Sequence, residues 1–269
     1  AYVQSTGEAA APWRVRFFTP NCEYDFSGHS AIATAHALVE EGFVDVPNEG
    51  TGIVVQTQSG RVPIDIHRET GGDRPHRDGA ALDRIMLSRT VGDHRPASVP
   101  VDEIARICCL DPFEIKMTGL PVEIVRNGIT LLLVPVRSAE ALRLMQPDLI
   151  RLMLMNQRIG VDTTDIFTLD AVREDAFTYS RHFSPATGLW EDIASGAAAA
   201  SMASYLLRHG VIEPGSLIMD QGNDMEALAR VFVEVDAERD GEVPVRIGGH
   251  AVTSITRRIS IRDERILIA

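Results

Sequence analysis

The chain has 269 residues, which is more than one hydrophobic core usually holds, so its length favours two domains. A formal net charge of −12 argues against a nucleic-acid-binding surface. No apolar run is long enough to span a membrane, and three cysteines, two of them adjacent, do not form a disulfide framework. The composition therefore predicts a globular protein of the reducing cytoplasm, with neither nucleic acid nor membrane as a partner.

Strand-like and helix-like segments alternate along the chain. Apolar or alternating runs predict strands, and small or amphipathic runs bounded by turn residues predict helices. In chain order we expect a strand at 16–20, a helix at about 28–41, a hairpin joining 53–57 to 62–66, a helix at 101–110, a strand at 130–136, a helix at 139–155 broken at Pro147, a strand at 181–185, a helix at 195–209, and strands at 230–235 and 243–261. The segment 68–80, which contains adjacent glycines, is predicted to be a mobile loop.

A short phrase occurs twice. Residues 16–20 (RFFTP) return as residues 181–185 (RHFSP). An acidic connector follows each copy, at 23–25 (EYD) and at 191–192 (ED). The shared phrase and connector predict that the chain is internally duplicated.

Each connector leads into a run of small or apolar residues that begins and ends with glycine, at 28–42 and 196–210. A closing glycine suits the left-handed residue that ends many helices. Because nearly every position is small or apolar, we expect a sheet to enclose each of these central helices. Each half is also expected to carry one outer amphipathic helix, with the chain crossing between the halves near 126–128.

The two phrases extend into longer patterns that resemble the signatures of the PhzF-like isomerases. The first reads F-T-P-x-x-E-x-D-x-x-G-H from Phe18 to His29, and the second reads S-R-x-F-x-P-x-x-G-x-x-E-D-x-x-S-G from Ser180 to Gly196. The resemblance covers essentially the whole chain. It implies an α+β, diaminopimelate-epimerase-like fold with two pseudo-symmetric lobes, each a barrel-like, mostly antiparallel sheet around a central helix. We place the first lobe at 1–125 plus 246–269 and the second at 126–245.

The resemblance also implies proton transfer without a cofactor, on a small carboxylated substrate in the cleft between the lobes. Two helix N-termini facing one cleft would offer free N–H groups and partial positive charge to a carboxylate or an enolate. His29 is the expected proton relay or substrate hydrogen-bonding group, and Asp192 the substrate-orienting or proton-handling carboxylate. Substrate-binding groups are expected at the two helix starts, namely Gly28, Ser30, Ser195, Gly196 and Ala197.

Simpler interpretations stay open for some of these residues. Asp192 also suits an acid that caps a helix, and Ser195 an ordinary helix start. Glu23 and Asp25 are interpreted as solvated or capping acids rather than a catalytic pair.

We expect no metal site. His36 and Glu40, one helical turn apart, lack a third ligand with suitable spacing, and neither CxxC nor HExxH occurs. The helix starts read SGH (27–29) and ASG (194–196), with Cys22 lying earlier, so two-thiol racemisation is not expected.

Two departures from the family pattern concern catalysis. Ala197 stands where relatives carry a serine. The family's catalytic glutamate precedes the first phrase, and because residues 1–3 (AYV) look like the tail of that stretch, we expect the glutamate and a first strand ahead of Ala1. The leading hypothesis is an isomerase, with a homodimer as an option. The alternatives are a non-catalytic or metabolite-binding member of the family and, more weakly, an amino-acid racemase or epimerase.

Overall fold

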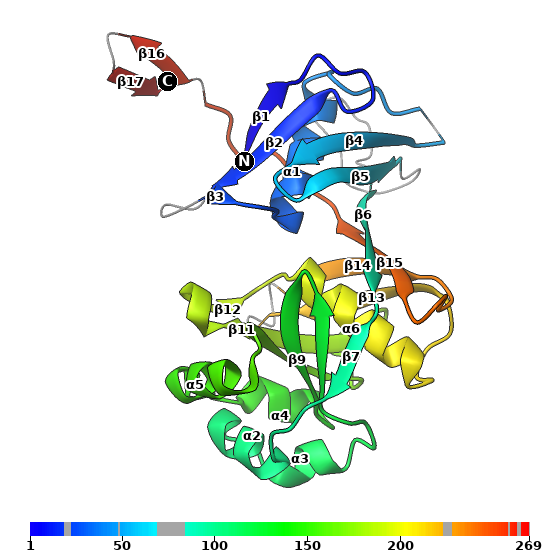
Figure 1. The fold of residues 1–269 in the computed structure, drawn as a ribbon, viewed down its shortest axis with the longest axis vertical. Helices are drawn as coiled ribbons and strands as arrows, with labels where there is room; N and C mark the ends of the chain where they lie inside the picture. Colours follow the sequence, from blue (N-terminus) through cyan, green and yellow to red (C-terminus); the bar gives the residue numbers. More distant parts are fainter. Residues whose placement is uncertain are drawn as a thin grey trace.

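The computed structural model describes residues 1–18, 23–47, 49–68, 84–222, 228–257, 259–262 and 265–268. It is an α+β structure with two lobes, one above the other in Figure 1. Most strands belong to one continuous mixed sheet of 15 strands, in the order β1-β2-β4-β5-β6-β15-β14-β13-β11-β10-β9-β8-β7, with β3 and β12 paired beside β2 and β11. Among the described residues, no helix is both long and apolar enough to cross a membrane.

The first lobe packs one helix against one side of a curved sheet. Its elements are β1 (Tyr2–Ser5), β2 (Trp13–Phe18), β3 (Glu23–Tyr24), α1 (Gly28–Glu40), β4 (Thr51–Thr57), β5 (Gly60–His67) and β6 (Arg84–Val91). Ala31, Ala35 and Leu38 bury one face of α1, whereas Ala33 and Ala37 are exposed. The helix is therefore covered on one face and not enclosed all round as predicted, because the described strands lie on one side of it.

The second lobe contains the other central helix and four outer helices. Its elements are β7 (Asp93–Pro96), α2 (Val101–Cys108), α3 (Pro112–Lys116), β8 (Glu123–Asn127), β9 (Ile129–Pro135), α4 (Ala139–Leu144), α5 (Leu149–Ile159), β10 (Thr163–Thr168), β11 (Thr178–Ser184), a 3-10 turn (Pro185–Thr187), β12 (Leu189–Asp192), α6 (Gly196–Arg208), β13 (Gly215–Gln221) and β14 (Ala229–Val235). Every residue of α6 from Ala198 to Leu206 is buried, as the predicted enclosed helix requires. Its small side chains let the surrounding sheet approach closely.

The duplication is visible in the strand register. Trp13 of β2 pairs with Val55 of parallel β4, and Thr178 of β11 pairs in the same way with Met219 of parallel β13. In each lobe, two further antiparallel strands follow, β5 and β6 in one and β14 and β15 (Val243–Gly249) in the other. The predicted pseudo-symmetric fold is confirmed.

An arginine–glutamate ion pair occurs once in each lobe, at equivalent positions of the repeat. Arg16 holds both carboxylate oxygens of Glu23, at 2.8 and 2.7 Å, and Arg181 holds both oxygens of Glu191, at 2.8 Å each. These are the arginine of each phrase and the first acid of each connector. The phrase therefore encodes a bidentate arginine–carboxylate contact that fixes the connector to the strand before it.

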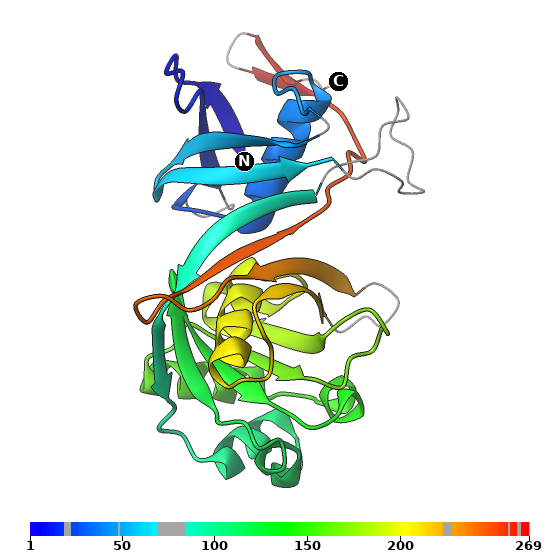
Figure 2. The same ribbon diagram turned by 90° about the vertical axis from the view of Figure 1, so that its right-hand side faces the viewer.

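The lobes are joined by β6 and β15, which run antiparallel and side by side between them (Figure 2). The chain thus passes to the second lobe along β6 and β7. The crossing predicted near 126–128 is wrong: Arg126 and Asn127 end β8, and Gly128, with a φ of +72°, forms the turn of the β8–β9 hairpin. Asn-Gly is a strong hairpin-turn signal, which explains the outcome.

Both outer helices predicted from the sequence lie in the second lobe. The helices α2 and α5 pack together over the same hydrophobic cluster, which includes Ile104 and Leu152. Since α2, α3 and β8 pack with β9 and α5, residues 93–127 lie with the second lobe, whereas the prediction had put residues up to 125 in the first. The remaining bounds of the two domains stay predictions.

The end of the chain differs from the single strand predicted at 243–261. Strand β15 ends at Gly249 and residues 250–257 form no strand. Among the described strands, β16 (Ile259–Arg262) pairs only with β17 (Arg265–Ile268). The loop predicted at 68–80 lies, beyond Arg68, outside the described residues.

Candidate functional site

The two central helices begin against one pair of opposed residues. Leu87 of β6 and Ile247 of β15 are register partners, so their side chains point to the same face of the sheet. A Cβ built on Gly28 would lie 3.8 Å from Leu87 Cδ1, and one built on Gly196 only 2.6 Å from Ile247 Cδ1. The helices α1 and α6 also contact each other. The N-termini of both helices therefore converge at the junction of the lobes.

The start of α6 is capped by a side chain. Ser195 Oγ accepts a hydrogen bond from Ala198 N at 3.2 Å, and Ser195 O accepts one from Ala199 N at 3.0 Å. These contacts use the third and fourth N–H groups of the helix. The first two, of Gly196 and Ala197, come before the first intrahelical bond and donate to no acceptor in the described part of the chain.

The start of α1 is arranged differently. Ser27 precedes it without a side-chain cap, and its hydroxyl donates to Ser30 Oγ at 3.0 Å. His29, the second residue of the helix, is exposed. Its ring makes no hydrogen bond or ion pair with any described residue, so it is accessible to a ligand.

Asp192 ends β12 in a turn that is held from both sides. Its Oδ1 accepts a hydrogen bond from Ala194 N at 3.2 Å. Gln221, which is buried, donates from Nε2 to Asp192 O at 2.7 Å and accepts from Ser195 N at 3.2 Å. One amide side chain thus fixes both Asp192 and the residue before α6.

Sequence reasoning missed this role of Gln221. Nothing in the sequence indicates that a glutamine at the end of a strand will bridge two backbone atoms of a distant turn. The one available signal was the glycine that follows, which has a φ of +126° and lets the chain leave the strand sharply.

The strand that carries Asp192 is tied to the outer layer. Arg181, whose side chain is 5% exposed, binds Glu191 and also donates to Leu142 O at 3.2 Å and Met145 O at 2.8 Å. Glu191 and Asp192 are adjacent in β12, so their side chains point to opposite faces. The arginine therefore anchors the strand from behind.

The residues interpreted as structural make structural contacts. Glu23 pairs with Arg16, whose hydrogen bond holds the pKa of the Glu23 carboxyl below its usual value, and Asp25 is exposed. His36 Nε2 lies 3.7 Å from Glu40 Oε2, and both contact the hydroxyl of Thr253. Cys22 lies outside the described residues.

A second arrangement has the connectivity of a hydrolase triad. His94 Nε2 lies 2.9 Å from Ser204 Oγ, and His94 Nδ1 lies 3.6 Å from Glu123 Oε2. Ser204 is fully buried in α6, so a substrate cannot reach its hydroxyl. Within the described part of the chain, no three His, Cys, Asp or Glu side chains are grouped to hold a metal ion.

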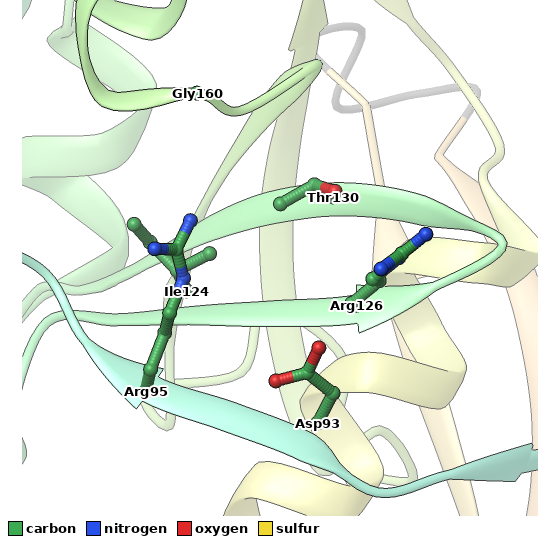
Figure 3. Close-up of a pocket in the computed structure, with 6 residues that line it drawn as sticks. All are labelled: Asp93, Arg95, Ile124, Arg126, Thr130 and Gly160. Carbon is green, nitrogen blue, oxygen red and sulfur yellow. The ribbon is translucent and has the colours of Figure 1, made fainter.

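A pocket of about 370 Å³ lies on the second lobe, away from the predicted site residues. Figure 3 shows its lining, with two arginine side chains near one aspartate, and the residues are Asp93, Arg95, Ile124, Arg126, Thr130 and Gly160. All belong to β7, β8, the start of β9 and the end of α5. The pocket therefore adds a polar surface but no residue of the candidate site.

Comparison with known proteins identifies relatives of the chain. The family model for "phenazine biosynthesis-like protein" matches residues 1–257. The chain is 28% identical over 253 residues to the uncharacterized isomerase YfhB of Bacillus subtilis, covering 94% of this chain and 81% of that one. It is 27% identical over 248 residues to trans-2,3-dihydro-3-hydroxyanthranilate isomerase of Pseudomonas aeruginosa, covering 92% and 77%. Because these relatives are named isomerases, the comparison supports an isomerase activity for this chain.

Solved structures support the fold. A PhzF-family phenazine biosynthesis protein of Bacillus anthracis is similar with a TM-score of 0.78 and 23% identity, over 91% of this chain and 79% of that one. A probable proline racemase of Agrobacterium radiobacter K84 is similar with a TM-score of 0.61 and 17% identity, over 91% and 71%. The predicted epimerase-like α+β fold is confirmed.

Proposed function

The chain belongs to the phenazine biosynthesis-like family, and we propose that it is an isomerase that moves a proton on a small carboxylated substrate without a cofactor. The observation that carries the proposal is the convergence of two helix N-termini at the Leu87–Ile247 pair. Helix N-termini present free N–H groups and partial positive charge, which favour a carboxylate and the enolate formed when a neighbouring carbon loses its proton.

His29 and Asp192 are the proposed proton-handling groups. The exposed ring of His29 is suited to relay a proton or to hydrogen-bond the substrate, because an imidazole ring can both donate and accept a proton. Asp192 is held in a fixed turn by Ala194 and Gln221, as an orienting carboxylate requires. The free N–H groups of Gly196 and Ala197 are the proposed contacts to the substrate carboxylate. That His29 and Asp192 reach one substrate is part of this proposal.

The relative from Pseudomonas aeruginosa is named for a cyclic substrate with a carboxylate, and we propose a substrate of that chemical class here. Ala197 has no hydroxyl to offer, so the first turn of α6 would bind the carboxylate through backbone N–H groups alone. Proton exchange is to be measured on the natural protein.

The test is exchange of substrate protons in deuterated water, followed by NMR across a panel of small cyclic and amino-acid carboxylates. We expect His29→Gln and Asp192→Asn each to slow exchange by about 100-fold or more, the range for loss of a general acid or base. His67→Gln and Asp236→Asn alter an exposed histidine and an exposed aspartate elsewhere, and we expect them to exchange at the normal rate. Rapid exchange in both site variants would contradict the proposal.

A second candidate is a metabolite-binding protein without activity, and Ala197 is the observation that favours it. The same panel separates the two. A carboxylate that raises the melting temperature yet never exchanges a proton indicates binding alone. Exchange confined to the α-carbon of amino acids, with inversion, indicates a racemase instead.

A further inference from the structure

One face of the second-lobe sheet carries two neighbouring rows of residues across β7, β8 and β9. Both rows consist of register partners: Asp93, Arg126 and Thr130 in one, and Arg95, Ile124 and Leu132 in the other. Residues that are opposed across strands, or two positions apart along one strand, point to the same face of a sheet. Both rows therefore present their side chains on one side of these three strands.

The outer helices cover only one of the rows. Ile124 is 3% exposed, Leu132 is fully buried, and both belong to the hydrophobic cluster that α2 and α5 also form. Asp93 and Arg126 of the other row are exposed, and they line the pocket of about 370 Å³ together with Gly160, the residue that follows α5 (Figure 3). The pocket therefore lies where the helical cover of the sheet ends, and its volume is that of a small-molecule site.

One wall of the pocket is fixed through its backbone. Thr130 N donates a hydrogen bond to Asp162 Oδ2 at 2.7 Å, and Asp162 N donates one to Thr130 O at 2.8 Å. Asp162 follows Gly160 by two residues, so these bonds tie the start of β9 to the end of α5. The wall is thus formed before any ligand binds.

The charged side chains of the pocket have no partner in the part of the chain that the structure describes. Arg95 and Arg126 make no hydrogen bond or ion pair there, and neither does the side chain of Asp93, although it is opposed to Arg126. Other arginines of this lobe lie within 3.0 Å of a carboxylate oxygen, such as Arg137, Arg158 and Arg181. Because the chain has 38 acidic and only 26 basic residues, two neighbouring arginines without a carboxylate point to an anion from outside the chain.

Protection of the sheet edge explains only part of this arrangement. Strand β7 ends the order of the described sheet, and charged side chains on an edge strand hinder pairing with another chain. That function accounts for Asp93 and Arg95. Arg126 lies on β8, which is paired with β7 on one side and β9 on the other, so it protects no edge.

We propose that this pocket binds a small amino acid, with the carboxylate held by Arg95 and Arg126 and the ammonium group held by Asp93. A guanidinium group suits a carboxylate because it offers parallel N–H donors. An ionised Asp93 only accepts hydrogen bonds, so it repels a simple anion and favours one that also carries a positive donor. The pocket contains no residue of the candidate functional site, so this second site does not depend on the proposed function.

The experiment follows two isoleucine methyl groups by ¹³C NMR in the natural protein, with the signals assigned through Ile124→Val and Ile247→Val. Ile124 lines the pocket, and Ile247 lies against Gly196 at the candidate functional site. The probes are L-alanine, acetate and methylamine, which carry both charged groups, the carboxylate alone and the ammonium alone. We expect L-alanine to shift the Ile124 signal in a saturable way and to bind about tenfold more tightly than either fragment.

The variants assign each charge of the ligand to its partner. Arg95→Gln and Arg126→Gln should each weaken the binding of L-alanine about tenfold. Asp93→Asn should weaken L-alanine and strengthen acetate, so that the two affinities converge. The control is Arg106→Gln, which alters an exposed arginine of α2 outside the pocket and should bind L-alanine as the wild type does.

Three results would overturn the proposal. They are an Ile124 signal that no probe shifts, equal affinities for L-alanine and acetate in the wild type, and unchanged binding of L-alanine in both pocket arginine variants. A shift of Ile247 with a silent Ile124 would place the ligand at the candidate functional site. That outcome contradicts the second site and leaves the proposed function standing, whereas a protein that exchanges no protons can still confirm the pocket.

Discussion

Leu87 and Ile247 are opposed in the β6–β15 ladder, and each lies against the first glycine of a different central helix. The same register position therefore fixes where both helices begin. The contact is tighter on the Ile247 side, where a Cβ on Gly196 would come within 2.6 Å of Cδ1. A methyl group on Gly196 would force the end of the Ile247 side chain to move, whereas Gly28 has room for a methyl group.

The first prediction tests that approach. Gly196→Ala should lower the free energy of unfolding by about 1 kcal/mol, because the end of the Ile247 side chain must move, and Gly28→Ala should lower it by less. Ile247→Val removes the clashing Cδ1, so the double variant should be more stable than the sum of the two single changes by about 1 kcal/mol. Urea unfolding of the four variants measures this, and simple additivity would contradict it.

The second prediction concerns two adjacent glycines of β15. A Cβ on Gly248 would overlap the carbonyl oxygen of Ile85, whereas one on Gly249 would lie 3.8 Å from the nearest atom, Arg230 O. Because backbone cannot move aside as a side chain can, Gly248→Ala should lose about 3 kcal/mol of stability and Gly249→Ala less than about 1 kcal/mol. Equal losses in thermal or urea unfolding would show that the strand can shift.

The duplicated fold was predictable because its signal is local. The Arg-x-Phe phrase, the acid that follows and the glycine that opens each helix lie within about 16 residues of each other in each copy, and the structure turns them into the same ion pair and the same helix start. Ser195 was likewise predictable as a helix start, since its cap bond reaches only to Ala198.

The elements that escaped prediction depend on distant partners. An amphipathic pattern states that α2 has an apolar face but not that α5, on the same lobe, will cover it. Gln221 is defined by backbone atoms of Asp192 and Ser195, and the pocket residue Arg126 by register with Asp93. Residues that lie opposite each other across strands leave no spacing in the sequence that would reveal them.

The third prediction compares the two ion pairs of the repeat. Arg181 is 5% exposed and makes four hydrogen-bond contacts, whereas Arg16 is 40% exposed and, among the described side chains, hydrogen-bonds only to Glu23. Arg181→Met leaves Glu191 and two carbonyl groups without their donor, so we expect a loss of about 3–5 kcal/mol. Arg16→Met should lose much less stability than Arg181→Met, because water screens the exposed pair. Similar losses of stability in chemical unfolding would mean that burial does not determine how much each ion pair stabilises the fold.

The fourth prediction concerns the clamp at Asp192. Gln221→Met keeps the volume of the side chain but removes both hydrogen bonds, to Asp192 O and from Ser195 N. We expect about a tenfold loss of proton-exchange activity, mainly in kcat, because the turn loses its fixed geometry and not its contacts with the substrate. Steady-state kinetics on an accepted carboxylate measure this. An unchanged kcat with a raised KM would instead place Gln221 among the substrate-binding groups.

The fifth prediction is a loss of stability in mild acid that comes from His94. Burial lowers the pKa of His94, the charge of Arg208 lowers it further, and Glu123 opposes them. In the unfolded chain the ring takes up a proton near its reference pKa of about 6.5, whereas in the folded chain it does so only at lower pH. The contribution of His94 to the free energy of unfolding is therefore fully present above about pH 6.5, and it is lost as the pH falls through the pKa of His94 in the folded chain.

The measurement is the free energy of unfolding in urea at several pH values from 8 to 5. One proton corresponds to a slope of up to about 1.4 kcal/mol per pH unit, and His94→Gln should reduce the slope by a measurable part of that value. His67→Gln, which alters an exposed histidine, should keep the wild-type slope. Parallel curves for the wild type and His94→Gln would show that the buried ring takes up its proton as readily in the folded chain as in the unfolded one.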